Sequence, residues 1–282
     1  MQTMSYLLIG TITADIVADG RILGGTVSYA APVVDLFGHD IRILSSADPH
    51  DSLLNPLFDL AETKIVPAEH TTTFSNIYRP TGRQQIIHQT AKNLEPRMLP
   101  EQWKNSNLVH LAPLADDVDY GFANQFPNAK VLLTPQGYMR RWGADGIVHF
   151  KEFLDKDVLQ AIDILVLSKQ DILAAPELEN EFPKYADHVV VTDGENGGTY
   201  YHNGDNMHYD AFPATEIDPT GAGDVFAASL LASLPLVNFD MSSALIVAAR
   251  LAALAVTVKG SKISLSSTNI QTMIQEALDK ND

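Results

Sequence analysis

The stretch 218–224, "DPTGAGD", combines flexible residues with a carboxylate in a pattern that suits phosphate chemistry. Helix formers follow it directly, so we expect a helix to begin at Asp224. The first N–H groups of a helix lack internal partners and carry partial positive charge, so Gly221, Ala222 and Gly223 would let an anion approach the main chain. In a plainer interpretation the glycines form a turn, and Asp224 only stabilises the start of its helix.

A catalytic interpretation accounts for the glycines and the acid together. Asp224 would take the proton of a hydroxyl group while the amides of Gly221, Ala222 and Gly223 hold the phosphoryl group that the oxygen attacks. Positioning and charge stabilisation supply most of the rate of phosphoryl transfer. A general base and an anion hole each contribute about 100-fold or more. The motif therefore predicts a phosphotransferase, provided that other motifs agree.

The elements that must position this motif alternate between short apolar runs and helical patterns. Nearly continuous apolar runs are typical of strands covered on both faces, so we expect an α/β fold with a mostly parallel central sheet between helices. The predicted strands are 6–10, 41–46, 108–112, 130–134, 163–168 and 188–192, and the predicted helices are 26–38, 118–126, 151–162, 224–234, 242–258 and 268–280.

Residues 71–91 form a different pattern, with β-branched and aromatic residues on either side of "PTGR". This pattern indicates a β-hairpin inserted into the α/β run, hence a small lid or an edge. No repeat or Pro-rich linker separates independent units. We therefore expect one domain over 1–282, with lid elements near 11–25 and 71–91.

Composition and charge exclude several classes of protein. The 282 residues carry a formal net charge of −16, which disfavours binding to nucleic acid or to an anionic membrane. There is no cysteine, so thiolate nucleophiles, disulfides and iron–sulfur clusters are excluded. No paired-histidine motif indicates a zinc site. The chain has no leader pattern and no apolar run near the length of about 20 residues that spans a bilayer, so we expect a soluble, cytoplasmic protein.

The motif "DPTGAGD" resembles the signature of the ribokinase-like carbohydrate kinases, the PfkB family. Four further stretches resemble family motifs in the expected order: "GTITADI", "GGTVSYAAPVVDLFG", "VVVTDGENGG" and "AALAVTVKGS". The residues that match in them are Asp15, Gly24, Gly25, Thr192, Gly194, Gly197 and Gly260. The resemblance therefore runs over nearly the whole chain.

The resemblance implies a ribokinase-like fold, a β-lid that contacts substrate, and ATP-dependent phosphorylation of a hydroxyl group with Mg²⁺ bridging the phosphates. Asp224 would be the base and Gly221 to Gly223 the anion hole. Asp15, Gly24 and Gly25 would bind a sugar or polyol. Ser168, Thr192, Gly194, Gly197, Thr220 and Gly260 would bind the nucleotide. Asp218 and Thr220 could also join a monovalent-cation site.

Several positions depart from the family pattern. Ser168 and Asp171 replace an N-x-x-E motif, which leaves Asp171 as an indirect metal residue or as the start of a helix over 170–179. Tyr29 occupies the place of a substrate-binding Asn. Gln136 and Arg140 match polar positions in the family, and Arg140 could contact substrate or phosphate, or pair with acids on the surface. On the lid, Asn76, Arg83 and Gln85 could contact hydroxyl groups or face outward.

Tyr29 and the lid stretch "TTTFSNIY" resemble inositol kinases within the family, so inositol is the leading substrate. A nucleoside, a ketohexose or a sugar acid is the alternative. There is little room between Asp15 and Gly24 for a long hairpin, which predicts a reduced lid and either a monomer or a homodimer. The altered metal motif also admits a second class of function, a nucleotide- or sugar-binding sensor without catalysis.

Overall fold

The computed structural model describes residues 3–79, 82–260 and 265–280. Within these residues the main sheet has nine strands in the order β15-β14-β13-β12-β9-β8-β1-β4-β5. The pairs β13–β14 and β14–β15 are antiparallel, and the other pairs are parallel. The strands are β1 (Ser5–Gly10), β4 (Asp40–Ala47), β5 (Glu62–Pro67), β8 (Leu108–Ala112), β9 (Lys130–Leu133), β12 (Ile164–Ser168), β13 (His188–Thr192), β14 (Gly198–His202) and β15 (Asp205–Tyr209). The structure confirms the expected mostly parallel sheet.

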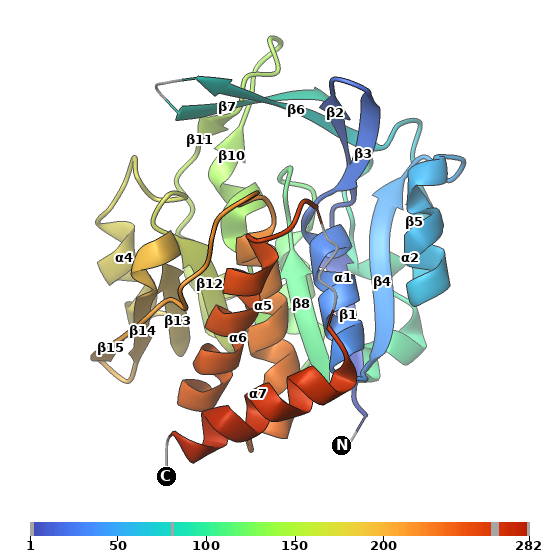
Figure 1. Ribbon diagram of the computed structural model, residues 1–282. Helices are drawn as coiled ribbons and strands as arrows, with labels where there is room; N and C mark the ends of the chain where they lie inside the picture. The colour runs from blue at the N-terminus through green and yellow to red at the C-terminus, as the bar shows by residue number, and fades with distance from the viewer. Residues whose placement is uncertain (1–2, 80–81, 261–264, 281–282) are drawn as a thin grey trace.

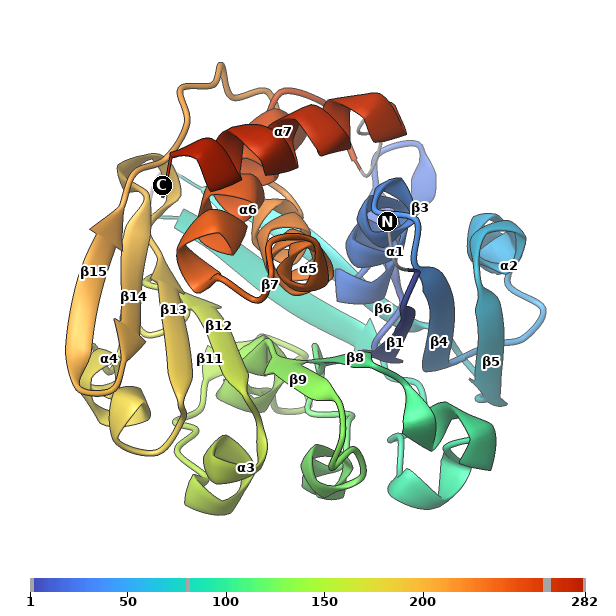
Figure 2. The same cartoon turned by 90° about the horizontal axis from the view of Figure 1, so that it is seen from below.

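Helices cover both faces of this sheet, as Figure 2 shows from below. One face carries α1 (Thr26–Leu36), α2 (Asn55–Leu60), α5 (Ala222–Ser233), α6 (Met241–Ala255) and α7 (Ser267–Asp279). The other face carries α3 (Lys156–Ala161), α4 (Leu178–Glu181) and several 3₁₀ turns. The 3₁₀ helices of the chain are η1 (Ser52–Leu54), η2 (Pro96–Met98), η3 (Glu101–Asn105), η4 (Tyr120–Asn124), η5 (Pro135–Met139), η6 (Phe182–Lys184), η7 (Gly194–Asn196) and η8 (Leu234–Leu236).

Strand β1 explains why the strands look continuously apolar in the sequence. Successive side chains of a strand point to opposite faces of the sheet. Tyr6 and Leu8 lie in the core beneath α1 and α5, whereas Leu7 and Ile9 lie in the core on the other face. All four side chains are fully buried. Both faces of the strand therefore require hydrophobic residues.

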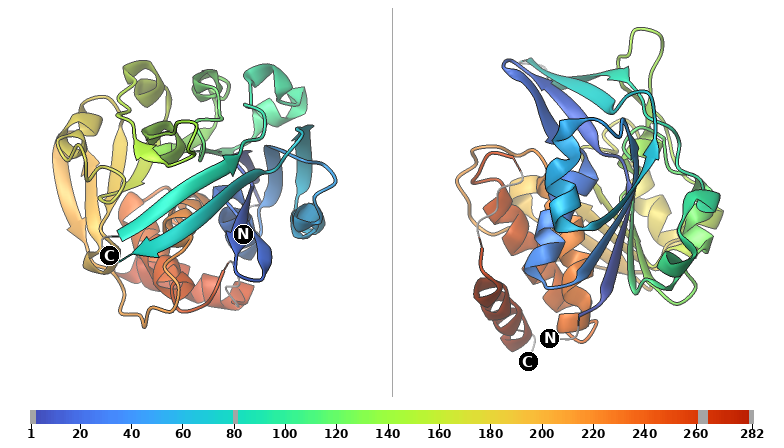
Figure 3. Two further views of the ribbon diagram at one scale, coloured as in Figure 1. Left: turned by 90° about the horizontal axis from the view of Figure 1, so that it is seen from above. Right: turned by 90° about the vertical axis from the view of Figure 1, so that its right-hand side faces the viewer.

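A second, smaller sheet lies across the carboxyl ends of the main strands (Figures 1 and 3). Its order is β3-β2-β6-β7, from β2 (Thr13–Val17), β3 (Gly20–Gly24), β6 (Thr72–Arg79) and β7 (Gly82–Gln89). The segments 11–25 and 71–91 thus share one sheet, because β2 pairs with β6 in parallel. The hairpin between Asp15 and Gly24 is short, with five residues in each strand. A further short sheet joins β10 (Arg140–Arg141) to β11 (His149–Phe150).

The sequence predictions for three helices were wrong in extent. Helix α5 begins at Ala222, two residues before Asp224. The segment 118–126 forms only the 3₁₀ turn η4, because Pro127 disfavours helical backbone in the residue before it. The segment 151–162 is helical only from Lys156, where the Asp155 side chain accepts a hydrogen bond from the Val158 amide and caps α3.

The chain order places a topological switch point beside β1. After β5 the chain crosses to β8, on the opposite side of β1 from β4. Ligands of open α/β sheets bind beyond the carboxyl ends of the strands at such a point. The small sheet lies over this same edge. No helix among the described residues combines the length and the apolar character that crossing a membrane requires.

Candidate active site

The glycine-rich turn of the sequence forms the start of helix α5. Gly221 caps the helix in the left-handed conformation, with φ at 81°, and its carbonyl accepts a hydrogen bond from the Val225 amide at 2.9 Å. The Ala222 amide donates to a carbonyl outside the helix, that of Pro219, at 3.3 Å. Gly223 is exposed, and a methyl group there would meet no atom within 4 Å. The main chain is therefore open to a ligand at Gly223, one residue before Asp224 in the first turn.

Tyr29 supports this turn from helix α1. A Cβ atom at Gly221 would lie 2.5 Å or less from three carbons of the Tyr29 ring. The Tyr29 side chain is buried, with 5% of its surface exposed. The residue expected to contact substrate thus packs against the glycine-rich turn, and its ring holds the start of α5 against the start of α1.

Asp15 lies over the start of α1, next to the two glycines that precede that helix. Its Oδ1 accepts a hydrogen bond from the Thr13 hydroxyl at 2.8 Å. A methyl group at Gly24 would lie 2.6 Å from Asp15 Oδ2. Gly25 caps α1 with φ at 86°, and a Cβ there would meet the Thr11 carbonyl at 2.5 Å. The glycines therefore let the β2–β3 hairpin and helix α1 approach closely around the Asp15 carboxylate.

The lid candidates lie on the inner face of the small sheet. Asn76 is two residues from Phe74, so the two side chains share one face. Phe74 is buried against Leu114, which follows strand β8 of the main sheet. Gln85 lies opposite Asn76 and donates a hydrogen bond to its Oδ1 at 2.9 Å. The outward-facing interpretation is therefore wrong for this pair. Arg83 lies in β7, but its side chain is outside the described part of the chain.

Arg140 is a buried cation between the lid and the main sheet. Its side chain is 8% exposed, so the interpretation as a surface arginine is wrong. Its Nη1 donates to the Leu114 carbonyl at 3.1 Å, and its guanidinium lies 5.8 Å from the centre of the Phe74 ring. Asp15 is in register with Phe74 on the neighbouring strand. Arg140 and Asp15 thus converge on the same part of the lid from different elements.

Gln136 belongs to the 3₁₀ turn η5, which also leads into Arg140. This turn packs closely on the end of β8, because a Cβ at Gly137 would overlap the Leu114 amide. Gln136 Nε2 donates to Asp171 Oδ1 at 2.9 Å. The Gln136 side chain, expected at the substrate, instead joins the residue expected near the metal.

Asp171 closes the loop that follows β12. Its Oδ2 accepts hydrogen bonds from the Ser168 amide at 2.9 Å and from the Ser168 hydroxyl at 3.0 Å. Residues 169–174 form turns, and the next helix, α4, begins only at Leu178. Asp171 therefore does not start a helix, as the alternative interpretation required. Its two oxygens are held by neighbours, which suits contact with a metal ion through bound water.

The neighbouring strand β13 ends in the glycine loop. Thr192 is in register with Ser168, so the two predicted nucleotide residues lie side by side. Gly194 and Gly197 have positive φ, at 55° and 80°, and a Cβ at Gly197 would overlap the Tyr209 carbonyl. Only glycine fits at position 197.

Sequence reasoning missed Lys169, which connects the loops after β12 and β13. Its Nζ lies 2.9 Å from Asp193 Oδ2, and this hydrogen bond raises the lysine pKa. The sequence could have indicated this residue, because the lysine lies between Ser168 and Asp171, in the stretch that replaces the N-x-x-E motif.

Asp218 connects the glycine-rich turn before α5 to the loop near Gly260. Its Oδ1 accepts from the Thr220 amide at 3.0 Å, and its Oδ2 accepts from the Gly260 amide at 3.4 Å. Although burial raises the pKa of Asp218, the hydrogen bonds from Thr220 and Gly260 outweigh it and lower the pKa. The loop near Gly260 is therefore fixed to the start of α5 by an ionised carboxylate.

Several of the predicted residues thus follow the ends of adjacent strands along one edge of the sheet. Of those expected at the substrate, Gln136 and Arg140 follow β9, Tyr29 lies in α1, and the others lie on the lid or at the start of α1. Of those expected at the nucleotide, Ser168, Thr192, Gly194 and Gly197 end or follow β12 and β13, whereas Thr220 precedes α5 and Gly260 follows α6. The start of α5 adjoins the first group through Tyr29 and the Gly260 loop through Asp218. Such an edge can hold a phosphoryl donor and an alcohol side by side, and Asp224 lies nearby in the first turn of α5.

Comparison with known proteins gives the same family as the motifs. Residues 158–268 match the pfkB family of carbohydrate kinases. An inositol 3-kinase from Zea mays is 31% identical over 258 residues, which cover 81% of this chain. The chain spans 66% of the length of that maize relative.

Solved structures of ribokinase-family enzymes share the fold. A pyrophosphate-dependent kinase in complex with a pyrophosphate analogue and myo-inositol superposes with a TM-score of 0.79 at 17% identity, covering 95% of this chain and 99% of its own. Arabidopsis thaliana ribokinase in complex with ribose and ATP superposes with a TM-score of 0.74 at 18% identity. The superposition covers 97% of this chain and 99% of the ribokinase chain. The fold is therefore ribokinase-like.

Proposed function

We propose that this chain, which belongs to the pfkB family of carbohydrate kinases, transfers a phosphoryl group from ATP to a hydroxyl group of a sugar or polyol. The observation that carries the proposal is the start of α5. A left-handed glycine cap, an open Gly223 and Asp224 share one helical turn at the edge where the ligand loops meet. A binding protein without catalysis would not need a carboxylate beside an anion-binding amide, which argues against a sensor.

In this mechanism Asp224 accepts the proton of the attacking hydroxyl group. The oxygen forms a bond to the γ-phosphorus as the bond to the β-phosphate breaks, and ADP leaves. The partial positive charge at the start of α5 and the amides of Gly221 to Gly223 stabilise the charge on the transferred group. A bound Mg²⁺ would neutralise the donor phosphates. Asp171 and Ser168 offer the oxygen atoms that suit this ion, through water.

The acceptor is proposed to be myo-inositol or a related cyclic polyol. The similarity to the maize inositol 3-kinase supports this choice. The inner lid face offers Asn76 and Gln85 to hydroxyl groups, and Asp15 and Arg140 lie where the lid meets the main sheet. Nucleosides, ketohexoses and sugar acids are the acceptors to be compared.

A panel of acceptors with two donors tests the proposal. Purified protein is incubated with Mg²⁺, with ATP or pyrophosphate, and with each of myo-inositol, ribose, fructose, cytidine and a sugar acid, and the phosphorylated product is measured. We expect ATP and an inositol to give the highest kcat/KM. Ligand binding without product from any pair would contradict the kinase and favour a sensor. Turnover with pyrophosphate alone would contradict ATP as donor but not the phosphoryl transfer.

A further inference from the structure

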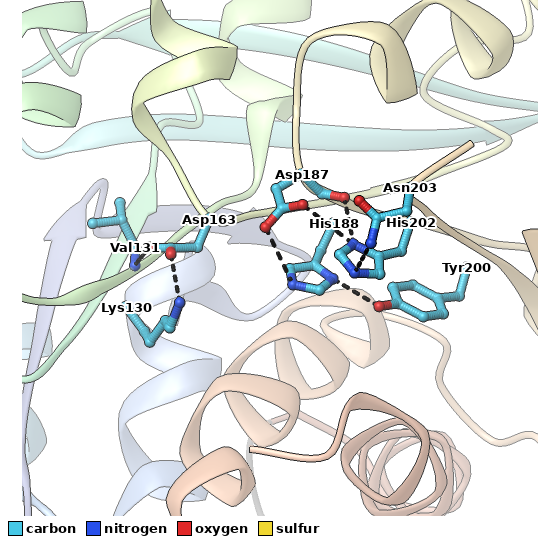
Figure 4. Close-up of polar contacts among 8 residues, drawn as sticks. All are labelled: Lys130, Val131, Asp163, Asp187, His188, Tyr200, His202 and Asn203. Atoms are coloured by element: carbon cyan, nitrogen blue, oxygen red, sulfur yellow. Dashed lines mark hydrogen bonds and ion pairs between the residues drawn. The ribbon is translucent and has the colours of Figure 1, made fainter. Parts of the chain in front are cut away.

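Two histidines and an aspartate meet at the amino-terminal end of β13, whereas the candidate active site lies at the carboxyl ends of the parallel strands. His188 is the first residue of β13 and His202 is the last residue of β14, and the two lie in register on antiparallel strands. Residues opposite each other in neighbouring strands share one face, so the imidazole rings stack with their centres 4.1 Å apart. Asp187 precedes β13 and turns its carboxylate toward both rings (Figure 4).

The distances among these side chains match a tetrahedral metal site. Asp187 Oδ2 lies 3.5 Å from His188 Nε2, and Asp187 Oδ1 lies 3.2 Å from His202 Nδ1. One ligand atom from each residue lies within 4.8 Å of the others. Two ligands that are each about 2.0–2.1 Å from a tetrahedral zinc ion are about 3.4 Å apart. An ion could therefore bind between the carboxylate and the rings once the two stacked rings turn their nitrogens toward a common point.

Neighbouring groups orient both rings for this role. The Tyr200 hydroxyl lies 2.7 Å from His188 Nδ1, which leaves Nε2 of that ring directed at Asp187 (Figure 4). Asn203 Nδ2 donates to His202 Nε2 at 2.8 Å, so the proton of that ring is on Nδ1, which lies 3.2 Å from Asp187 Oδ1 and donates to the Asp187 backbone carbonyl at 3.1 Å. Binding of a metal ion at Nδ1 would release this proton. Metal-bound histidines characteristically donate their second N–H to an oxygen atom, as Nδ1 of His188 can donate to the Tyr200 hydroxyl.

The cluster is open to an ion from solution. The side chain of Asp187 is 58% exposed, that of His202 is 34% exposed and that of His188 is 18% exposed. Two nitrogens and one oxygen are the donor set of zinc-class ions rather than of Mg²⁺ or Ca²⁺.

We propose that Asp187, His188 and His202 form a binding site for a divalent transition-metal ion of the zinc class. The ion would connect the start of β13 to the end of β14. Thr192, at the other end of β13, adjoins the glycine loop, so the site is separate from phosphoryl transfer. Its expected effect is on the stability of this edge of the sheet, not on turnover.

Zinc titration of protein from which any histidine tag has been removed tests the proposal. Isothermal calorimetry and competition with a chromophoric chelator should give one Zn²⁺ per chain and a thermal unfolding midpoint that rises with zinc. His202→Ala and Asp187→Asn should abolish or greatly weaken this binding. Tyr200→Phe should weaken it by about 10- to 100-fold, because it removes only the outer hydrogen bond.

His208→Ala is the matched control. His208 also has a carboxylate neighbour, Asp210, at 3.5 Å, but it belongs to a pair without a second histidine. The His208→Ala variant should bind zinc as the unchanged protein does. Circular dichroism establishes that each variant is folded, and the exposed Asp187 provides a variant that leaves both rings in place. Zinc affinity that is the same in His202→Ala, Asp187→Asn and the unchanged protein would overturn the proposal, as would the absence of a one-to-one site.

Discussion

The ring of Tyr29 lies directly against the α-carbon of Gly221, so that no side chain fits between helix α1 and the start of α5. Gly221 also has φ at 81°, which costs other residues about 1–2 kcal/mol. We therefore expect Gly221→Ala to lower the free energy of unfolding by about 2–5 kcal/mol, since overpacking adds about 1–3 kcal/mol. Urea denaturation measures this loss, and shortening Tyr29 to Leu in the same protein should restore part of it.

Gly223→Ala separates stability from function in the same turn. A methyl group at Gly223 has open space around it, and alanine in a helix is about 0.5–1 kcal/mol more stable than glycine. The variant should unfold at the same or a higher urea concentration. Its kcat should fall if a phosphoryl group approaches the main chain there. A variant as active as the unchanged protein would show that the ligand does not contact Gly223.

Arg140→Lys tests whether the buried guanidinium serves the substrate. Lysine cannot reproduce the planar contact over Phe74 or its directed hydrogen bonds. Loss of a hydrogen bond to a charged group costs about 1.5–3 kcal/mol, so kcat/KM for the alcohol should fall by about 10- to 100-fold. Steady-state kinetics measure the change. Arg141→Lys is the control, because Arg141 is exposed and its Nε donates to the Phe150 carbonyl, away from Phe74. Equal effects of the two substitutions would contradict the role of Arg140.

Asp171→Asn tests the metal assignment. Asparagine preserves the size of the side chain but removes the charge that would attract hydrated Mg²⁺. We expect the Mg²⁺ concentration for half-maximal rate to rise by about 10-fold or more, in line with loss of an outer-shell partner. Asp163→Asn, at the other end of β12, should leave this concentration unchanged. An unchanged Mg²⁺ requirement in Asp171→Asn would show that Asp171 only supports the loop.

His110 makes stability depend on pH. It is fully buried in β8, and burial lowers its pKa from 6.5 to about 3. The folded state therefore binds fewer protons than the unfolded state between these values. The contribution of the neutral, buried His110 ring to the free energy of unfolding is complete above pH 6.5. This contribution is lost as pH falls, by up to about 1.4 kcal/mol per pH unit. Unfolding free energies of the unchanged protein should fall more steeply from pH 6.5 to 4 than those of His110→Gln. Parallel curves would contradict this assignment.

The sequence was sufficient for six of the nine strands of the main sheet, but β5, β14 and β15 were not predicted from it. Apolar runs such as Tyr6–Gly10 are readable because both faces of each strand are buried. The start of α5 was misplaced by two residues, since Gly221 is the cap and Gly223 belongs to the first turn.

Long-range contacts were beyond the sequence. The inward orientation of Asn76 depends on the packing of Phe74 against Leu114. The pairing of His188 with His202 depends on the register of two antiparallel strands. Nothing in local spacing reports either contact, because each is fixed only when the strands pair and pack.

Replacement of Asp224 by Asn tests the central claim most directly. The substitution keeps the size of the side chain and removes the group that accepts the proton. Single-turnover kinetics with ATP and the best acceptor should show a rate reduced by about 100- to 10,000-fold, while calorimetry finds ATP binding essentially unchanged. A rate close to that of the unchanged protein would contradict the assignment of Asp224 as the base.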